Sequence, residues 1–376
     1  MGLQARLTEK QRHIVLLFTV LVVLKVFLVL CLHFIPLSFF QDLPVFRETD
    51  LYHNLKVKGI YPNRRSMLDM LSNSFDSEAY LAIAKNGYRN PSNLQWMFMY
   101  PAFIRFFSVF LGVKVASFVV SNLASFVAVA LFYHIARSYV SADSAFKSCL
   151  IFILYPYNAV YWLLSYSEPL FMVFLLASWM FFQKNKLVFC GVFMLLASFT
   201  RFPGVLLFPI TTFAYLLKNY KKIKNPVILR NLIHLNVFIL PVLYFFFLYI
   251  PHQTGLGFHE AEFNNFHNIR FVFPPLGAVP AGVFGWLFTY FFFLGSWRLR
   301  EKNRPLFWYA MILMVFYTSV LGDPSYCLGR FLGTIWPVFL YYGLIFDRND
   351  MLFASSIFIF CALLFAVFTG NLVSFI

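Results

Sequence analysis

The chain has 376 residues, of which 61% are hydrophobic and only 12% are charged, and its net charge is +15. A soluble protein of this length carries about 25% charged residues, so the composition excludes a water-soluble globular domain and predicts an all-α polytopic membrane protein. Five cysteines lie far apart, at 31, 149, 190, 327 and 361, which excludes a disulfide framework and a zinc-binding spacing.

The N-terminal segment begins with a basic stretch, residues 1–12, and continues into a long apolar run, 13–35. This run is too long for the hydrophobic region of a signal peptide, and no small-residue cleavage site follows it. We therefore expect the first membrane-spanning helix at 13–35.

Residues 36–114 are predicted to form one large outer loop. Within it, the apolar stretch 97–111, "MFMYPAFIRFFSVFL", is short and contains Pro101 and Arg105. Counting this stretch as a span would invert every later loop and place the basic loops outside. It is therefore predicted to be an amphipathic helix lying on the outer membrane surface.

The same loop contains two acidic residues close together, Asp76 and Glu78, in "SFDSEAYLAIAKNGY". At this spacing on a helix the two side chains point to different sides, so they are not predicted to share a proton. Asp76 is expected to cap a helix that Gly87 ends. Since a carboxylate beside a hydroxyl can take its proton, Asp76 is also a candidate catalytic base.

Ten further apolar runs follow this loop. They are 115–136, 148–164, 167–182, 187–201, 203–217, 231–250, 279–296, 305–321, 331–346 and 351–372. Backbone polar groups in lipid must bond internally, so each run is predicted to be a helix, which gives about eleven spans. Several runs are shorter than the roughly 20 residues of a straight span, so short neighbours are expected to be broken or tilted helices.

The basic residues gather on one side of this predicted topology. With the N-terminus in the cytoplasm, the inside segments hold 17 of the 30 Lys and Arg residues and 5 of the 15 acidic residues. Short loops rich in Lys and Arg remain in the cytoplasm. The net charge therefore reflects membrane orientation, and no nucleic-acid partner is predicted.

Unusual polar residues gather in five stretches on the predicted outer face. The stretches are 74–88, 165–171, 200–204, 255–270 and 322–330. Glu168 precedes Pro169 at a tight turn, so it either starts a helix favourably or belongs to a site. Arg201 either reaches the membrane interface or holds a lipid phosphate, and Arg330 either pairs with Asp323 or binds substrate.

One of these stretches, "HEAEFNNFH", contains His259, Glu260, Glu262 and His267. Its spacing is not the HExxH of zinc enzymes and would not place the ligands on one helix face, so no metal site is predicted. The five stretches together indicate a polar cavity on the non-cytoplasmic face. The cavity has a candidate base and candidate phosphate-binding cations, and the sequence has no Gly-rich nucleotide loop. An enzyme there could take an activated group from a lipid phosphate.

These stretches carry a family resemblance. "FDSEAYLAIAKNGY" resembles the W-D-x-x-x-[YF]-x-x-I-A-x-x-G-Y stretch of the GPI mannosyltransferase 2 family, and "YPYNAVYWLLSYSEPLFMVFLLAS" is similar to its helix pair containing YSE. "MFMYPAFIRFF", "SFTRFPGVLLFP" and "LGRFLGTIWPVFLYY" resemble its F-F-P-L-x-P, Arg-x-x-Gly and final Arg-Phe/Tyr segments. The order and spacing match over roughly residues 70–345.

The resemblance implies a C-type glycosyltransferase fold in one transmembrane domain, 1–376, whose outer loops are 36–114 and 251–278. It implies transfer of the second mannose, α1,6-linked and with inversion, from dolichyl-phosphate-mannose to a mannosylated glucosaminyl-phosphatidylinositol. The active site would lie in the lumen of the endoplasmic reticulum, within membrane lipid. The scheme demands no metal or other cofactor and leaves open a small membrane partner subunit.

By the same resemblance, Asp76 is the general base or an acceptor-binding carboxylate. The residues implied to bind substrate are Phe75, Glu78, Tyr80, Tyr166, Glu168, Arg201 and Arg330. The chain departs from the family at Phe75, where Trp is usual, and in "TRFPG", where Phe-Pro replaces Ser-Asn. Both changes remove side-chain hydrogen-bonding groups.

Three other functions fit a polytopic chain. One is a different glycosyltransferase that uses another polyprenyl-phosphate sugar, and one is a lipid or solute transporter. A transporter would more often show an internal repeat and charged, broken helices at the bilayer midplane, whereas Lys25 is the one charge within the predicted spans. A non-catalytic scaffold subunit is the third, although such a subunit would be expected to lose the acid at position 76.

Overall fold

The computed structural model describes residues 8–34, 67–72, 76–89, 93, 96–222, 225–245, 281–320 and 324–372. All regular secondary structure in these ranges is helical. The α-helices are α1 Glu9–Phe34, α5 Met67–Ser72, α6 Asp76–Asn86, α7 Met99–Leu111, α8 Val113–Ala136, α9 Ala142–Leu154, α10 Pro156–Tyr161, α11 Glu168–Gln183, α12 Leu187–Thr200, α13 Leu207–Asn219, α14 Pro226–Asn236, α15 Ile239–Tyr244, α17 Ala281–Lys302, α18 Arg304–Val320, α19 Pro324–Leu332, α20 Trp336–Ile345 and α21 Arg348–Leu372. Two 3-10 helices, η2 Phe202–Leu206 and η3 Tyr220–Lys222, flank α13.

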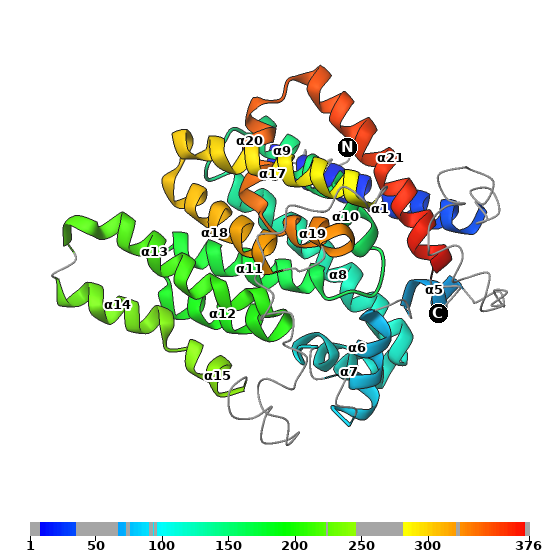
Figure 1. Cartoon of the computed structure of the whole chain (residues 1–376), viewed down its shortest axis with the longest axis horizontal. Coiled ribbons are helices and arrows are strands. Elements are labelled where there is room, and N and C mark those ends of the chain that lie inside the picture. Colours follow the sequence, from blue (N-terminus) through cyan, green and yellow to red (C-terminus); the bar gives the residue numbers. More distant parts are fainter. Residues whose placement is uncertain are drawn as a thin grey trace, which may run out of the picture.

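The fold is built around α11, which packs against α8 on one side and α12 on the other. The C-terminal third of the chain returns to this centre, because α20 packs on α9 and α19 contacts α10. The last helix, α21, crosses the first helix, α1, so both ends of the described chain lie in the same part of the molecule (Figure 1).

The outer surface of the helix bundle is apolar and suited to contact with lipid. Within the described residues, three helical stretches are long and apolar enough to cross a membrane, namely Glu9–Phe34, Val113–Ala136 and Pro226–Tyr244. Their exposed faces carry large apolar side chains, such as Val23 on α1 and Leu229 on α14. Contiguous apolar surface of this kind marks a membrane protein, which confirms the predicted class. The count of eleven spans stays a prediction.

The predicted runs are helical where the structure describes them, but several are broken where one continuous helix was expected. The run 148–164 divides into α9 and α10 because Pro156 follows Tyr155, whose backbone is held extended at φ −52° and ψ 122°. The run 203–217 begins as the 3-10 helix η2 before α13. The run 331–346 divides at residues 333–335, after which α20 starts with Pro337 in its first turn.

The stretch 97–111 forms a helix, as predicted. α7 buries Tyr100, Pro101 and Ile104 and exposes Phe106 and Phe110, so it has one face for the bundle and one apolar outer face. Gly112, with φ +72°, separates it from α8. Its position on the outer membrane surface stays a prediction.

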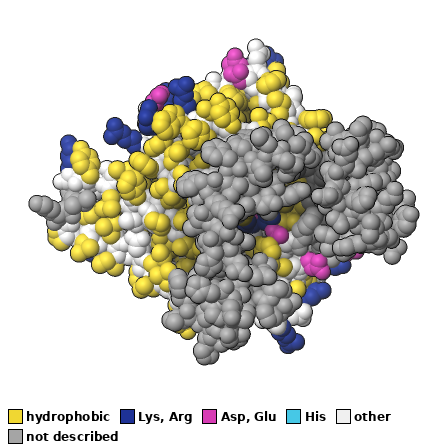
Figure 2. All heavy atoms as spheres, in the orientation of Figure 1, with side chains coloured by type: hydrophobic (Ala, Val, Ile, Leu, Met, Phe, Trp, Pro, Cys, Tyr) yellow, Lys and Arg dark blue, Asp and Glu magenta, His cyan; other side chains and the backbone are white. Residues whose placement is uncertain are grey.

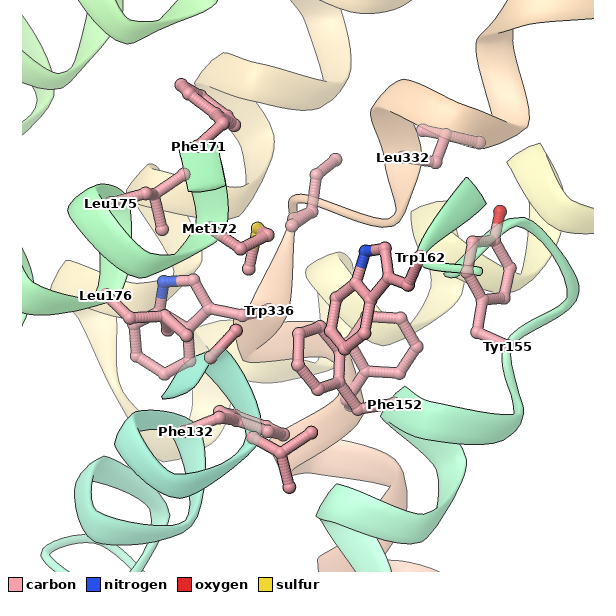
Figure 3. Close-up of a cluster of buried hydrophobic side chains, with 14 of the residues drawn as sticks. Phe132, Phe152, Tyr155, Trp162, Phe171, Met172, Leu175, Leu176, Leu332 and Trp336 are labelled. Atoms are coloured by element: carbon pink, nitrogen blue, oxygen red, sulfur yellow. The ribbon is translucent and has the colours of Figure 1, made fainter. Parts of the chain in front are cut away.

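An aromatic core joins α8, α9, α10, α11 and α20. Phe152 lies 4.7 Å from Phe132 and 4.9 Å from Trp162 between ring centroids, and Trp336 lies 6.0 Å from Phe132. Figure 3 shows Trp162 and Trp336 beside Met172 of α11, with Leu332 of α19 close by. Rigid rings of this size fix the helix ends that they adjoin, including those that carry the polar residues described next.

Candidate functional site

Helix α6 presents the acidic residues of the outer loop. Asp76 and Glu78 lie in its first turn and Lys85 in its last, as the helix dipole favours. Gly87, with φ +70°, ends the helix as predicted. The side chain of Asp76 is 20% exposed and faces the bundle. Glu78 is fully on the exposed side, as the spacing predicts, and lies outside the cluster that Asp76 joins.

Three other helix ends meet Asp76. Glu168 is the first residue of α11, Arg201 directly follows the last residue of α12, and Arg330 lies in the last turn of α19. Their side chains are 5%, 8% and 7% exposed. We call Asp76, Glu168, Arg201 and Arg330 the ionic cluster.

The cluster is joined by charge-assisted hydrogen bonds. Nη2 of Arg330 lies 2.5 Å from Oδ2 of Asp76, and its Nε donates to Oε1 of Glu168. Nη1 of Arg201 lies 2.8 Å from the same oxygen of Glu168 and donates to Oγ of Ser167 over 3.1 Å. Oε2 of Glu168 is buried and has no partner within the described residues. Two carboxylates and two guanidiniums therefore balance in charge, as buried charges must, while one acceptor atom stays unused.

Aromatic rings hold the two guanidinium groups. Arg330 lies over Tyr161 at 4.9 Å and over Tyr166 at 4.8 Å from the ring centroids. Arg201 lies over Phe331 at 4.9 Å. Cation–π contacts of this kind hold a planar cation in place without neutralising it. Both cations therefore keep N–H donors in a fixed orientation.

Tyr80 of α6 extends the cluster through a hydroxyl pair. Its Oη lies 2.8 Å from Oγ of Ser167, and its ring packs edge-on against Tyr100. Burial raises the pKa of the Tyr80 phenol to about 12, so the group stays neutral and keeps its proton. Tyr80 and Ser167 thus form a neutral polar edge beside the ion pairs.

A second polar network supports the 162–167 turn, which joins α10 to α11. Nζ of Lys25 donates to the carbonyl of Trp162 over 2.9 Å, and Nδ2 of Asn122 donates to that of Leu163 over 3.2 Å. Oγ of Ser121 donates to the carbonyl of Leu164 over 2.8 Å. Helix ends leave such carbonyls without intrahelical partners, and here side chains of α1 and α8 satisfy three in succession. This network fixes the turn that leads to Ser167 and Glu168.

The structure brings together six of the eight residues predicted for the site. These are Asp76, Tyr80, Tyr166, Glu168, Arg201 and Arg330. Glu78 lies apart, and Phe75 is outside the described residues. The alternative pairing of Arg330 with Asp323 concerns a residue that is also outside them, whereas Arg330 itself pairs with Asp76 and Glu168.

Sequence reasoning missed Ser167, Tyr161 and Phe331, which touch the two arginines. Ser167 stands in the polar "SYSEP" stretch and Phe331 follows Arg330, so proximity in sequence was a usable signal for both. Tyr161 lay inside a run predicted to be one span. No group of three or more His, Cys, Asp or Glu residues able to hold a metal occurs in the described part of the chain. The stretch 255–270 lies outside it.

Asp76 is the most exposed member of the ionic cluster. Figure 2 shows acidic and basic side chains close together near the middle of this face. The partial exposure of Asp76 agrees with a position at the mouth of the ionic cluster.

No protein-family model matches the chain, and no curated protein is significantly similar to it in sequence. One similar solved structure is that of ArnT from Cupriavidus metallidurans bound to undecaprenyl phosphate, with a TM-score of 0.56 and 14% sequence identity. The match covers 76% of this chain and 59% of that chain, so this chain spans little more than half the length of ArnT. The likeness concerns the fold alone: over the matched part, the helices of this chain are arranged like those of ArnT.

Proposed function

We propose that the chain is a membrane-embedded glycosyltransferase that moves a sugar from a polyprenyl-phosphate carrier to a hydroxyl group. The observation that carries the proposal is the ionic cluster, which sets a partly exposed carboxylate beside two buried arginines in an ArnT-like fold. ArnT itself was solved with a polyprenyl phosphate bound. Two fixed guanidinium groups suit the phosphate of such a carrier.

The reaction needs a base and a stabilised leaving group. The carboxylate of Asp76 takes the proton of the acceptor hydroxyl while the hydroxyl oxygen bonds to the anomeric carbon. The bond from that carbon to the phosphate oxygen breaks, and its electron pair leaves with the polyprenyl phosphate. Arg330 and Arg201 stabilise the additional negative charge on the phosphate. The attack is on the face opposite the leaving group, so the anomeric configuration inverts.

The resemblance supports a finer proposal. Five of the positions that it singles out, Asp76, Tyr166, Glu168, Arg201 and Arg330, belong to or touch the ionic cluster. We propose dolichyl-phosphate-mannose as donor and a mannosylated glucosaminyl-phosphatidylinositol as acceptor, with an α1,6 product. The site would face the lumen of the endoplasmic reticulum, with the N-terminus in the cytoplasm. The oxygen of Glu168 without a partner would accept a hydrogen bond from a sugar hydroxyl.

The test is sugar transfer by the full chain reconstituted in nanodiscs. Radiolabelled dolichyl-phosphate-mannose and the mannosylated acceptor are supplied, and the labelled glycolipid is quantified. An undecaprenyl-phosphate sugar is supplied in a parallel assay. Transfer from dolichyl-phosphate-mannose supports the finer proposal, and transfer from the other donor alone supports the coarser one. If neither donor is consumed, the glycosyltransferase proposal is wrong.

Asp76→Asn tests the role of the base. Loss of general-base catalysis is expected to lower the rate of transfer about 10²–10⁴-fold. The matched control is Asp143→Asn, which removes a carboxylate from an exposed pair with Lys147 on α9, and the control is expected to transfer normally. Transfer by Asp76→Asn at the wild-type rate would show that another group takes the proton.

A further inference from the structure

The ionic cluster has no spare positive charge for a phosphate. Its two guanidinium groups are matched by two carboxylates, and each is already bonded to at least one of them. A polyprenyl-phosphate sugar carries one negative charge on its phosphodiester. Its phosphate can gain a full ion pair only if one carboxylate gives up an arginine.

Asp76 is the carboxylate that can be replaced. Glu168 is 5% exposed and accepts from both Arg201 and Arg330, so its removal would take the carboxylate from Arg201 and leave Arg330 with Asp76 alone. Asp76 is 20% exposed, and within the described residues its side-chain ion pair is with Arg330 alone. As the first residue of α6, its carboxylate also remains favoured by the helix dipole after it leaves Arg330.

Arg330 can exchange one anion for the other without moving. Nε is bonded to Glu168, and the group lies over the rings of Tyr161 and Tyr166, which hold its plane. The Nη2 group donates to Asp76, which at 20% exposure is the most exposed member of the cluster. A planar guanidinium binds phosphate oxygens at least as well as carboxylate oxygens.

We propose that the phosphate of the donor replaces Asp76 on Arg330 and thereby frees Asp76 to act as the base. The inference rests on the proposed function. Before the donor binds, Arg330 occupies Oδ2 of Asp76 and competes with any acceptor hydroxyl for it. After the exchange, Asp76 accepts the acceptor hydroxyl. Donor binding therefore favours acceptor binding, and the arginine–aspartate pair sets the order of the two substrates.

Binding of the lipid phosphate gives the first test. Dolichyl phosphate and, for comparison, uncharged dolichol are titrated into nanodiscs that hold the wild type, Asp76→Asn or Asp143→Asn. The expected result is that Asp76→Asn binds dolichyl phosphate about tenfold more tightly than the wild type, as loss of one competing ion pair implies, and binds dolichol equally. Asp143→Asn should bind both as the wild type does. Equal or weaker binding of dolichyl phosphate by Asp76→Asn overturns the inference.

A second test measures how each substrate changes the affinity for the other. It distinguishes the anion exchange from simple repulsion between Asp76 and the phosphate. Affinity for the acceptor consumed in the transfer assay is measured with and without saturating dolichyl phosphate. In the wild type, dolichyl phosphate should raise acceptor affinity, and the acceptor should raise dolichyl phosphate affinity by the same factor. In Asp76→Asn the two affinities should be independent. Independent affinities in the wild type, or equal coupling in the variant, overturn the inference.

The outcomes also separate this inference from the proposed function. If the wild type transfers sugar but Asp76→Asn does not bind dolichyl phosphate more tightly, the anion exchange is wrong and the proposed glycosyltransferase function stands. If the wild type neither transfers sugar nor binds dolichyl phosphate, the exchange and the proposed function are both wrong. Asp76→Ala is measured in parallel and is also expected to bind dolichyl phosphate more tightly. A variant with a folding defect, seen as a lower melting temperature, is then not the sole basis of the result.

Discussion

At the scale of single residues, Glu168 is the hub of the site. One of its oxygens accepts from both arginines, although Arg201 and Arg330 come from different helices. A carboxylate so deeply buried is tolerated because two cations face it, and each cation depends on it in turn. Its contribution is therefore to hold α12 and α19 at the start of α11.

We expect Glu168→Gln to destabilise the folded chain by about 3–5 kcal/mol, because two buried guanidinium groups lose their shared counter-charge. Thermal unfolding in nanodiscs measures the effect. Asp143→Asn is the control, since its exposed pair with Lys147 is expected to contribute about 0–1 kcal/mol. A melting temperature for Glu168→Gln equal to that of the control would show that the arginines are held by other groups.

At the scale of elements, the ends of helices matter more than their middles. Each member of the ionic cluster stands within one turn of a helix end, and the 162–167 turn depends on side chains from α1 and α8. Among the side chains that support this turn, Lys25 is the most distant from it in sequence. Its ammonium group also donates to Asn122 and Ser125, over 2.7 Å each.

Lys25→Met is expected to lower both stability and transfer, since it leaves the Trp162 carbonyl without its donor and loosens the turn that carries Glu168. The cost of an unsatisfied buried acceptor is about 1–3 kcal/mol. Lys25→Arg should restore part of the rate of transfer. Leu30→Met, on the exposed face of α1, is the control and should change neither quantity. Normal transfer by Lys25→Met would show that the turn holds its shape alone.

Close packing of α20 on α9 depends on Gly343. A Cβ added there would lie 2.4 Å from the backbone nitrogen of Ser148, so the helices would have to move apart. We expect Gly343→Ala to cost about 1–3 kcal/mol in thermal unfolding, as overpacking does. Leu344→Ala, the neighbouring residue on the exposed side, should change stability by about 0.5 kcal/mol or less. Equal melting of the two variants would contradict the close contact.

At the scale of the whole molecule, the site and the basic loops lie at opposite ends of the same helix. Glu168 starts α11, while Lys184 and Lys186 follow its last residue. A helix of 16 residues is about 24 Å long, against roughly 30 Å for the hydrocarbon core of a membrane. The proposed orientation places the site on the non-cytoplasmic side and this basic turn in the cytoplasm.

Labelling with a membrane-impermeant maleimide tests this orientation. In sealed microsomes, Lys184→Cys should react from the cytoplasmic side, and Glu78→Cys should react only after the membrane is permeabilised. Both positions are exposed, and the unsubstituted chain provides the blank for the native cysteines. The reverse pattern would place Asp76 in the cytoplasm and would overturn the proposed access to a lumenal donor.

The sequence by itself determined the class of protein and the positions of most helices, while its polar stretches together with the family resemblance singled out six of the residues that meet in the site. Composition and apolar runs determine the class and the helices because the backbone must bond internally in lipid and charged side chains are costly there. Only the tertiary structure decided which charges pair. Asp76 and Arg330 are 254 residues apart, and no periodicity in the chain relates them. It also decided where helices break, because a proline such as Pro156 ends one helix and starts the next in a direction that only packing selects.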